Sequence, residues 1–129
     1  MLKAKDIMTT EKIFTIGPDE ILDEAIKKLV KNKVSGVPVV DENKKVIGMI
    51  SEKDILNFMF SGNVKQTKVS EAMSTNVTMF SPDTDIDKIS LVMGEKKIRR
   101  VPIVEDGKLV GIISRRSIIR IVLDMGDNF

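Results

Sequence analysis

The sequence predicts an α/β (α+β) fold made of two copies of one unit, each ordered strand, helix, strand, strand, helix. The first observation behind this prediction is an internal repeat with a nearly constant separation of 65 to 63 residues. The matching pairs are Met8 and Met73, Pro18 and Pro82, Pro38 and Pro102, Gly48 and Gly111, and Ser51 and Ser114. The second is that helical spacing of apolar residues alternates with short β-branched runs. The third is the length of 129 residues, which suits one compact module and leaves no room for two large domains.

Each repeat opens with an amphipathic helix after an expected short strand. Residues 19–33 carry apolar side chains at helical spacing with charges between them, after a Gly-Pro-Asp start that suits a helix N-terminus. Residues 83–97 repeat the pattern with Ile86, Ile89 and Met93 on one face. Ser90 and Gly94 interrupt that face, so the second helix is the less regular of the two.

A hairpin and a second helix complete each repeat. Residues 37–40 and 46–50 flank the polar turn 41–44, and residues 101–104 and 109–113 flank the turn 105–108. The Asp106-Gly107 pair is the stronger turn signal. The second helices are expected to open at Ser51 and Ser114. Because roughly 60 residues form only a marginal core, repeats 1–64 and 65–129 are expected to pack sheet against sheet about a pseudo-two-fold axis.

The composition excludes most catalytic and nucleic-acid-binding classes. The chain has no Cys and no His, which removes disulfides, thiolate nucleophiles, His bases and the usual zinc sites. No pair of carboxylates stands with an activated nucleophile, so no catalytic residue and no metal site are predicted. A net charge of +2, with no Trp or Tyr, argues against nucleic-acid binding. With neither a signal peptide nor an 18-residue apolar segment, a cytoplasmic protein without membrane contact is expected.

Four short motifs of the first repeat have similar counterparts, in the same order, in the second repeat. In the first repeat they are Asp6-Ile7-Met8, Gly17-Pro18-Asp19, Val34-Ser35-Gly36-Val37-Pro38-Val39-Val40-Asp41 and Gly48-Met49-Ile50-Ser51-Glu52-Lys53-Asp54. Over about 120 residues the chain resembles a tandem pair of cystathionine β-synthase (CBS) domains, a Bateman module. The resemblance implies a stand-alone, non-catalytic regulatory module without a catalytic cofactor. Such a module binds AMP, ADP, ATP or S-adenosylmethionine between its repeats, adjusts an unidentified partner protein and often dimerises.

The candidate ligand site centres on the start of the helix after Ser51. Asp54 could accept from both ribose hydroxyls, and Ser51 lies beside free N–H groups that favour phosphate. The same Ser-x-x-Asp spacing is also a capping box, and the two roles are compatible. The second repeat has Ser117 where the family usually has Asp. A weaker second site at Ser114, Arg116 and Ser117 is therefore expected, which either stays empty or takes another ligand.

The basic residues of the site are predicted from the distribution of arginine. All five Arg side chains lie in the second repeat, and Arg100, followed by Arg99, is the best candidate for contacting phosphate. The alternative is a solvated basic face. Arg115 has a weaker case. The resemblance places adenine against the segment before the first helix and against the Pro-containing strand. Val37 is assigned mainly to the core and only secondarily to the site. The remaining site residues are Lys12, Ile13, Val34, Gly36, Val37, Pro38 and Ile50.

The ends of both second helices are unusually apolar. Residues 58–60 and 118–125 carry more apolar side chains than one internal face can bury, which predicts a homodimer interface. The same feature supports a rival function, a CBS-fold interaction or dimerisation module that binds no nucleotide.

Overall fold

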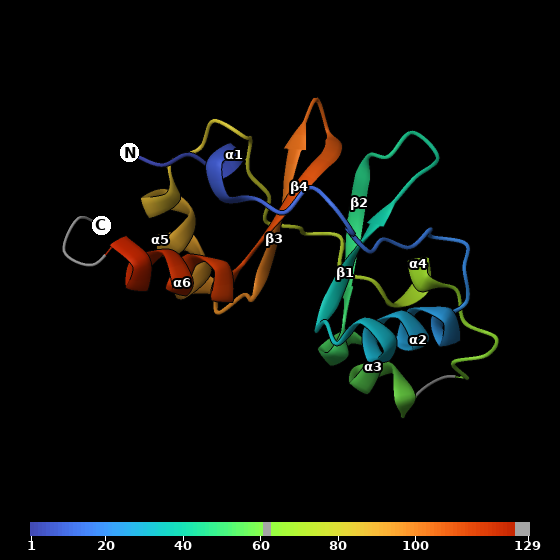
Figure 1. The fold of residues 1–129 in the computed structure, drawn as a ribbon. Helices are drawn as coiled ribbons and strands as arrows, with labels where there is room; N and C mark the ends of the chain where they lie inside the picture. The colour runs from blue at the N-terminus through green and yellow to red at the C-terminus, as the bar shows by residue number, and fades with distance from the viewer. Residues whose placement is uncertain (61–62, 126–129) are drawn as a thin grey trace. The chain divides into compact units, whose positions relative to one another are not determined.

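The structure, a computed structural model, describes residues 1–60 and 63–125 and contains two compact units (Figure 1). The first-repeat unit is Phe14–Val77. The second-repeat unit combines Met1–Ile13 with Thr78–Phe129. The compact units divide the chain differently from the predicted repeats 1–64 and 65–129, because the N-terminal segment packs with the second repeat; the repeat boundaries stay a prediction. The pseudo-two-fold packing of the repeats stays a prediction.

The first-repeat unit has the predicted helix, hairpin and second helix, whereas the predicted first strand is reduced to a single bridge at Ile16. It contains α2 (Leu22–Asn32), β1 (Gly36–Val40), β2 (Val46–Ser51), α3 (Glu52–Met59) and the short α4 (Val69–Ala72). Strands β1 and β2 form an antiparallel hairpin in which Val37 pairs with Ile50. Ile16 extends this sheet by a parallel bridge to β1, and Ser74 by an antiparallel bridge to β2.

The second-repeat unit repeats this plan. It contains α1 (Ala4–Ile7), α5 (Ile86–Lys96), β3 (Arg100–Glu105), β4 (Lys108–Ser114) and α6 (Arg115–Met125). Phe80 bridges β3 in parallel, and Thr9 bridges β4 antiparallel. Asp106 and Gly107 have φ of 53° and 81°, the positive values that a tight hairpin turn of this kind requires. The α/β (α+β) prediction is confirmed.

The first helix of each repeat begins later than the sequence pattern predicts. Residues 17–20 form a turn instead, in which the Gly17 N–H donates to Glu20 Oε2 at 2.7 Å and the Glu20 N–H donates to the Gly17 carbonyl at 3.4 Å. Ile21 then stays extended and bridges Lys68. The polar residues at the start of the predicted helix are therefore used in a turn.

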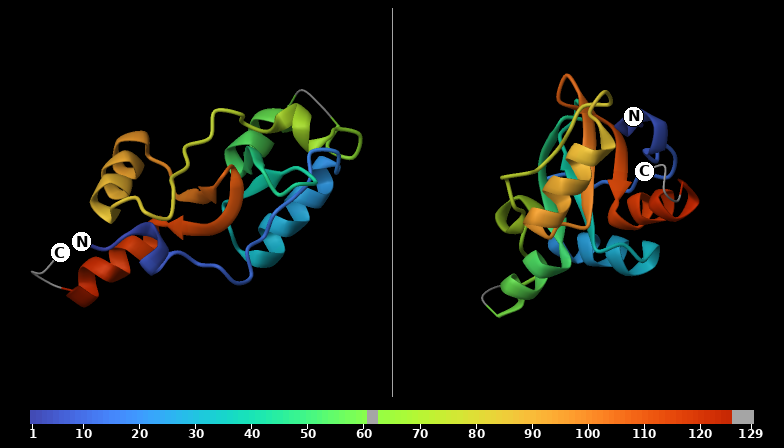
Figure 2. Two further views of the ribbon diagram at one scale, coloured as in Figure 1. Left: turned by 90° about the horizontal axis from the view of Figure 1, so that it is seen from above. Right: turned by 90° about the vertical axis from the view of Figure 1, so that its left-hand side faces the viewer.

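Two single-turn helices, α1 and α4, were not predicted, because four residues show no periodicity. In each, an acidic side chain accepts a hydrogen bond from the backbone N–H three residues earlier, Asp6 from Lys3 and Glu71 from Lys68, both at 2.8 Å. The first residue of each helix, Ala4 or Val69, is fully buried in the core of its unit. Both views of Figure 2 show α1, in blue, together with the red α6 of the second-repeat unit.

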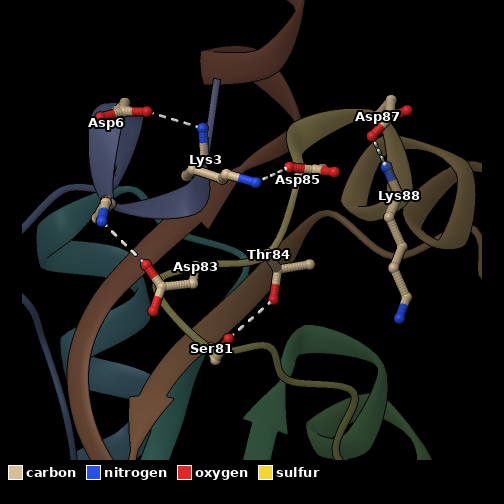
Figure 3. A network of polar contacts seen from close by, with 9 residues as sticks. Lys3, Asp6, Ser81, Asp83, Thr84, Asp85, Asp87 and Lys88 are labelled. Atoms are coloured by element: carbon tan, nitrogen blue, oxygen red, sulfur yellow. Dashed lines mark hydrogen bonds and ion pairs between the residues drawn. The ribbon is translucent and has the colours of Figure 1, made fainter. Parts of the chain in front are cut away.

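Ion pairs hold the N-terminal segment to the loop before α5 (Figure 3). Lys3 pairs with Asp85, and Lys5 Nζ lies 2.9 Å from Asp83 Oδ1. The hydrogen bond and charge of Asp85 raise the pKa of Lys3, and the hydrogen bond from Lys3 lowers the pKa of Asp85. The Ala4 N–H also donates to the Thr84 carbonyl at 2.8 Å. Backbone and side chains together therefore fix this segment.

Each unit has its own apolar core beneath its hairpin. In the first-repeat unit the core residues include Ile16, Leu22, Val37, Val39, Ile50 and Val69. In the second-repeat unit they include Ala4, Ile86, Ile89, Val101, Ile103 and Ile113. Five residues of each list occupy matching positions of the repeats, so largely the same pattern builds both cores.

Candidate functional site

Ser51 and Asp54 form a reciprocal capping box at the start of α3. The Asp54 N–H donates to Ser51 Oγ at 3.3 Å, and the Ser51 N–H donates to Asp54 Oδ2 at 2.9 Å. The Ser51 hydroxyl also donates to Asp54 Oδ2, at 2.8 Å. The capping interpretation is confirmed, and the carboxylate is held in one orientation at a helix N-terminus.

A third residue, Ser74, orients the same carboxylate. Its hydroxyl donates to Asp54 Oδ1 at 2.9 Å from the segment that follows α4. The Ser74 backbone is itself fixed, because it exchanges two hydrogen bonds with Met49 of β2, both at 2.9 Å. Three donors therefore occupy the carboxylate, which offers about four acceptor positions. Ser74 was missed in the sequence, where its only signal is its place next to the repeated Met73.

The residues expected to flank adenine lie along the β1–β2 hairpin. Gly36, Val37, Pro38 and Ile50 are buried, and Val34 is half-buried. Val37 and Ile50 belong to the core of the unit, so the assignment of Val37 to the core is confirmed. A Cβ on Gly36 would lie 3.3 Å from the Ile50 carbonyl oxygen, so the close approach of β2 already favours glycine there.

The start of α6 has the same cap without the charge. The Ser117 N–H donates to Ser114 Oγ at 3.1 Å, and the two hydroxyl oxygens lie 2.9 Å apart. Arg116 is exposed on the first turn of this helix. The predicted weaker site thus has a neutral hydroxyl where the first repeat has a carboxylate.

Arg99 and Arg100 differ in their surroundings. Arg100 begins β3 opposite Ser114 and is half-buried, and this burial lowers the pKa of its guanidinium from the usual value. Arg99 is exposed, and its carbonyl accepts from the Arg115 N–H at 2.8 Å. Two consecutive arginines therefore have separate environments, as the alternation of side chains along a strand predicts.

The predicted site residues divide between the two units. Asp54, Ser51 and the hairpin residues belong to the first-repeat unit, where the structure brings the first two together. Lys12, Ile13, Arg99, Arg100, Ser114, Arg116 and Ser117 belong to the second-repeat unit. Lys12 is exposed with φ of 55°, and Ile13 is half-buried. A ligand site formed by both groups stays a prediction.

Residues 1–60 and 63–125 hold neither a membrane-spanning helix nor a cluster of metal ligands. No helix in these ranges combines the length and hydrophobicity that crossing a membrane requires. The same ranges contain no group of three or more His, Cys, Asp or Glu side chains placed to hold a metal ion.

Comparison with known proteins finds relatives over nearly the whole chain. A CBS domain-containing protein of Bacillus subtilis, YhcV, is 36% identical over 115 residues, covering 88% of this chain and 81% of that protein. The crystal structure of CBSX2 in complex with AMP has a TM-score of 0.86 at 30% identity, covering 95% of this chain and 97% of that one. The CBS domain pair of protein MJ0100, in complex with 5′-methylthioadenosine and S-adenosyl-L-methionine, has a TM-score of 0.83 at 28% identity, covering 95% and 97%.

Some relatives are much longer than the matched region. The chain spans 23% of an inosine-5′-monophosphate dehydrogenase of Methanocaldococcus jannaschii, at 30% identity over 120 residues and 92% of this chain. The family model described as CBS domain matches this chain twice, at residues 4–61 and 69–124. With both repeats matched and both units folded in the same way, this chain belongs to the CBS domain family as a CBS pair.

Proposed function

We propose that this chain is a regulatory module that binds an adenosyl ligand, an adenine nucleotide (AMP, ADP or ATP) or S-adenosylmethionine, with Asp54 holding the ribose. The observation that carries the proposal is the Asp54 carboxylate, oriented by Ser51 and Ser74 at the start of α3. The adenosyl ligands of CBSX2 and MJ0100 support it. Binding then changes the affinity for a partner protein, and the module itself catalyses no reaction.

The chemistry of this site follows from the groups present. Ribose hydroxyls are donors, and the acceptor position that Ser51 and Ser74 leave open on the Asp54 carboxylate accepts from one of them more strongly than a neutral oxygen would. Arg100, followed by Arg99, supplies positive charge for phosphate, and the backbone around Gly36 and Pro38 flanks the base. Because Ser117 is neutral, the site at Ser114, Arg116 and Ser117 binds more weakly.

The test is calorimetric titration with AMP, ATP, S-adenosylmethionine and NAD, because the chain has no Trp or Tyr to report binding optically. Asp54→Ala is expected to weaken binding by about 1.5–3 kcal/mol, the contribution of a hydrogen bond to a charged group. Asp6→Ala is the matched control, since it removes the same kind of capping carboxylate from α1. It should lower stability and leave affinity unchanged; equal affinity in wild type and Asp54→Ala contradicts the ribose role.

A second candidate function is protein interaction through a homodimer, supported by exposed apolar side chains at the ends of α3 and α6. Met59 is 57% exposed and Phe60 95% exposed, and Leu123 on α6 is 80% exposed. Single exposed apolar residues are common, but groups of them mark interaction surfaces. Light scattering across micromolar concentrations tests this candidate: a dimer supports it, and a monomer throughout contradicts it. Calorimetric silence toward the whole panel would favour it over ligand binding.

A further inference from the structure

A cavity of about 470 Å³ lies between α5 and α6 in the second-repeat unit. Its size falls in the range of roughly 300–1,000 Å³ that is usual for small-molecule sites. Met93 and Ile118 form its apolar part and are 4% and 7% exposed, and Ile119 adds a more exposed apolar edge. The cavity is half open to solvent, and its floor is apolar.

Three cations surround the same cavity: Lys97, Arg99 and Arg115. None of its lining residues is acidic. Within residues 1–60 and 63–125, no carboxylate forms an ion pair with any of the three. Three like charges beside one apolar cavity repel one another, and an anionic ligand would relieve this repulsion.

The backbone fixes the positions of these cations. Lys97 ends α5 in the left-handed conformation, with φ of 55°, and its N–H donates to the Met93 carbonyl. Arg115 begins α6, and its N–H bonds to the Arg99 carbonyl at 2.8 Å. The side chains thus start from two segments that are hydrogen-bonded to each other.

The first repeat provides an internal comparison, because its backbone has the same arrangement. Lys33 ends α2 with φ of 54°, and the Glu52 N–H donates to the Ser35 carbonyl at 2.9 Å. At four of the lining positions the side chain changes in polarity, size or charge between repeat 1 and repeat 2: Ile26 with Ser90, Val30 with Gly94, Ser35 with Arg99, and Glu52 with Arg115. The second repeat has thus replaced two apolar side chains by small residues and gained two arginines, one of them in place of a glutamate.

We propose that the α5–α6 cavity of the second-repeat unit is a binding site for a small molecule with an apolar body and one phosphate or carboxylate group, separate from the adenosyl site at Asp54. The apolar body lies against Met93 and Ile118, where Gly94 leaves space. The anionic group binds Arg99, Arg115 and Lys97. Arg99, the less favoured of the two candidates for the adenosyl phosphate, is then assigned to this site, and Arg100 alone remains at the adenosyl site.

The probe for this site is octyl phosphate, titrated calorimetrically against the full chain below its micelle-forming concentration. Inorganic phosphate and octanol, tested separately, represent its two halves. We expect octyl phosphate to bind with about one ligand per chain and more tightly than either half. Failure of octyl phosphate to bind, or affinity no better than that of inorganic phosphate, overturns the proposal.

Two variants restore features of the first repeat. Arg115→Glu is expected to lower the affinity for octyl phosphate about tenfold or more, the effect of losing a charge-assisted contact. Arg120→Glu is the matched control, because it makes the same change of charge at an exposed position of the same helix, outside the cavity lining. Gly94→Leu fills the cavity from a position where a Cβ would meet nothing within 4 Å, so it should abolish binding without unfolding the chain. Equal losses in the two Glu variants, or full binding by Gly94→Leu, overturn the proposal.

A further variant separates this site from the proposed function. Asp54→Ala should leave the affinity for octyl phosphate unchanged, whatever it does to AMP binding. If it weakens octyl phosphate and AMP together, the probe occupies the adenosyl site and the separate cavity site is refuted. If AMP never binds but octyl phosphate does, only the adenosyl proposal fails.

Discussion

Gly111→Ala is expected to destabilise the fold by overpacking the contact between β4 and the end of α1. A Cβ at Gly111 would lie 2.5 Å from Met8 Sδ, 2.8 Å from its Cγ and 3.0 Å from its Cβ. The Sδ atom can rotate away, but the Met8 Cβ moves only with the backbone, whose N–H bonds to the Ala4 carbonyl at 2.9 Å. Overpacking of this kind costs about 1–3 kcal/mol, more than the gain of roughly 0.4–1 kcal/mol from replacing a flexible glycine.

Urea denaturation followed by circular dichroism measures this cost, with Gly94→Ala as the matched control. Gly94 lies in α5 with nothing within 4 Å of an added Cβ, so alanine there should stabilise the chain by about 0.5–1 kcal/mol. Met8→Ala removes the two nearest atoms, Sδ and Cγ, and leaves only the Cβ contact at 3.0 Å, so its combination with Gly111→Ala should cost less than the two single changes added together. An additive double variant, or a Gly111→Ala protein as stable as wild type, refutes the overpacking argument.

Three further predictions concern charge, ligand and assembly. Lys3 holds the pKa of Asp85 below its ordinary value, so this ion pair stabilises the fold at neutral pH. Its contribution to the free energy of unfolding is lost as the pH falls through the acidic range. The difference in Tm between wild type and Asp85→Asn should therefore close toward pH 3. Arg100→Ala should weaken ATP binding more than adenosine binding in calorimetric titrations, and equal losses remove Arg100 from the phosphate role. Replacing Phe60 and Leu123 together by Ser should shift a dimer toward monomer in light scattering, with unchanged mass contradicting the predicted interface.

The repeated elements could be predicted because their signals are local. Periodic apolar residues identify α2, and the Asp106-Gly107 turn identifies the second hairpin. The less regular apolar pattern of α5 is also explained by the structure. Ser90 and Gly94, which interrupt its apolar face, are among the residues that line the cavity beside α6. Their role could not be predicted, because it depends on the neighbouring helix.

Features that depend on distant segments could not be predicted. Nothing near Ser74 in the sequence indicates that its hydroxyl orients Asp54, since the two residues are 20 positions apart and meet only through the bridge to Met49. The packing of α1 with the second repeat could not be predicted either, because a four-residue helix has no periodicity. Asp85, which pairs with Lys3 just before this helix, lies 82 residues away from it. Local patterns define the elements, whereas tertiary contacts decide which elements share a unit.

The packing of the N-terminal segment with the second repeat has a consequence for synthesis on the ribosome. Phe14–Val77 is one continuous stretch, so it can become compact as soon as it has emerged from the exit tunnel. Met1–Ile13 is made before that stretch but packs against β4, which is made more than 90 residues later. This segment is thus translated before the first-repeat unit but finds its place after it, and until then its Ala4 and Met8, buried and half-buried in the folded unit, are available to chaperones.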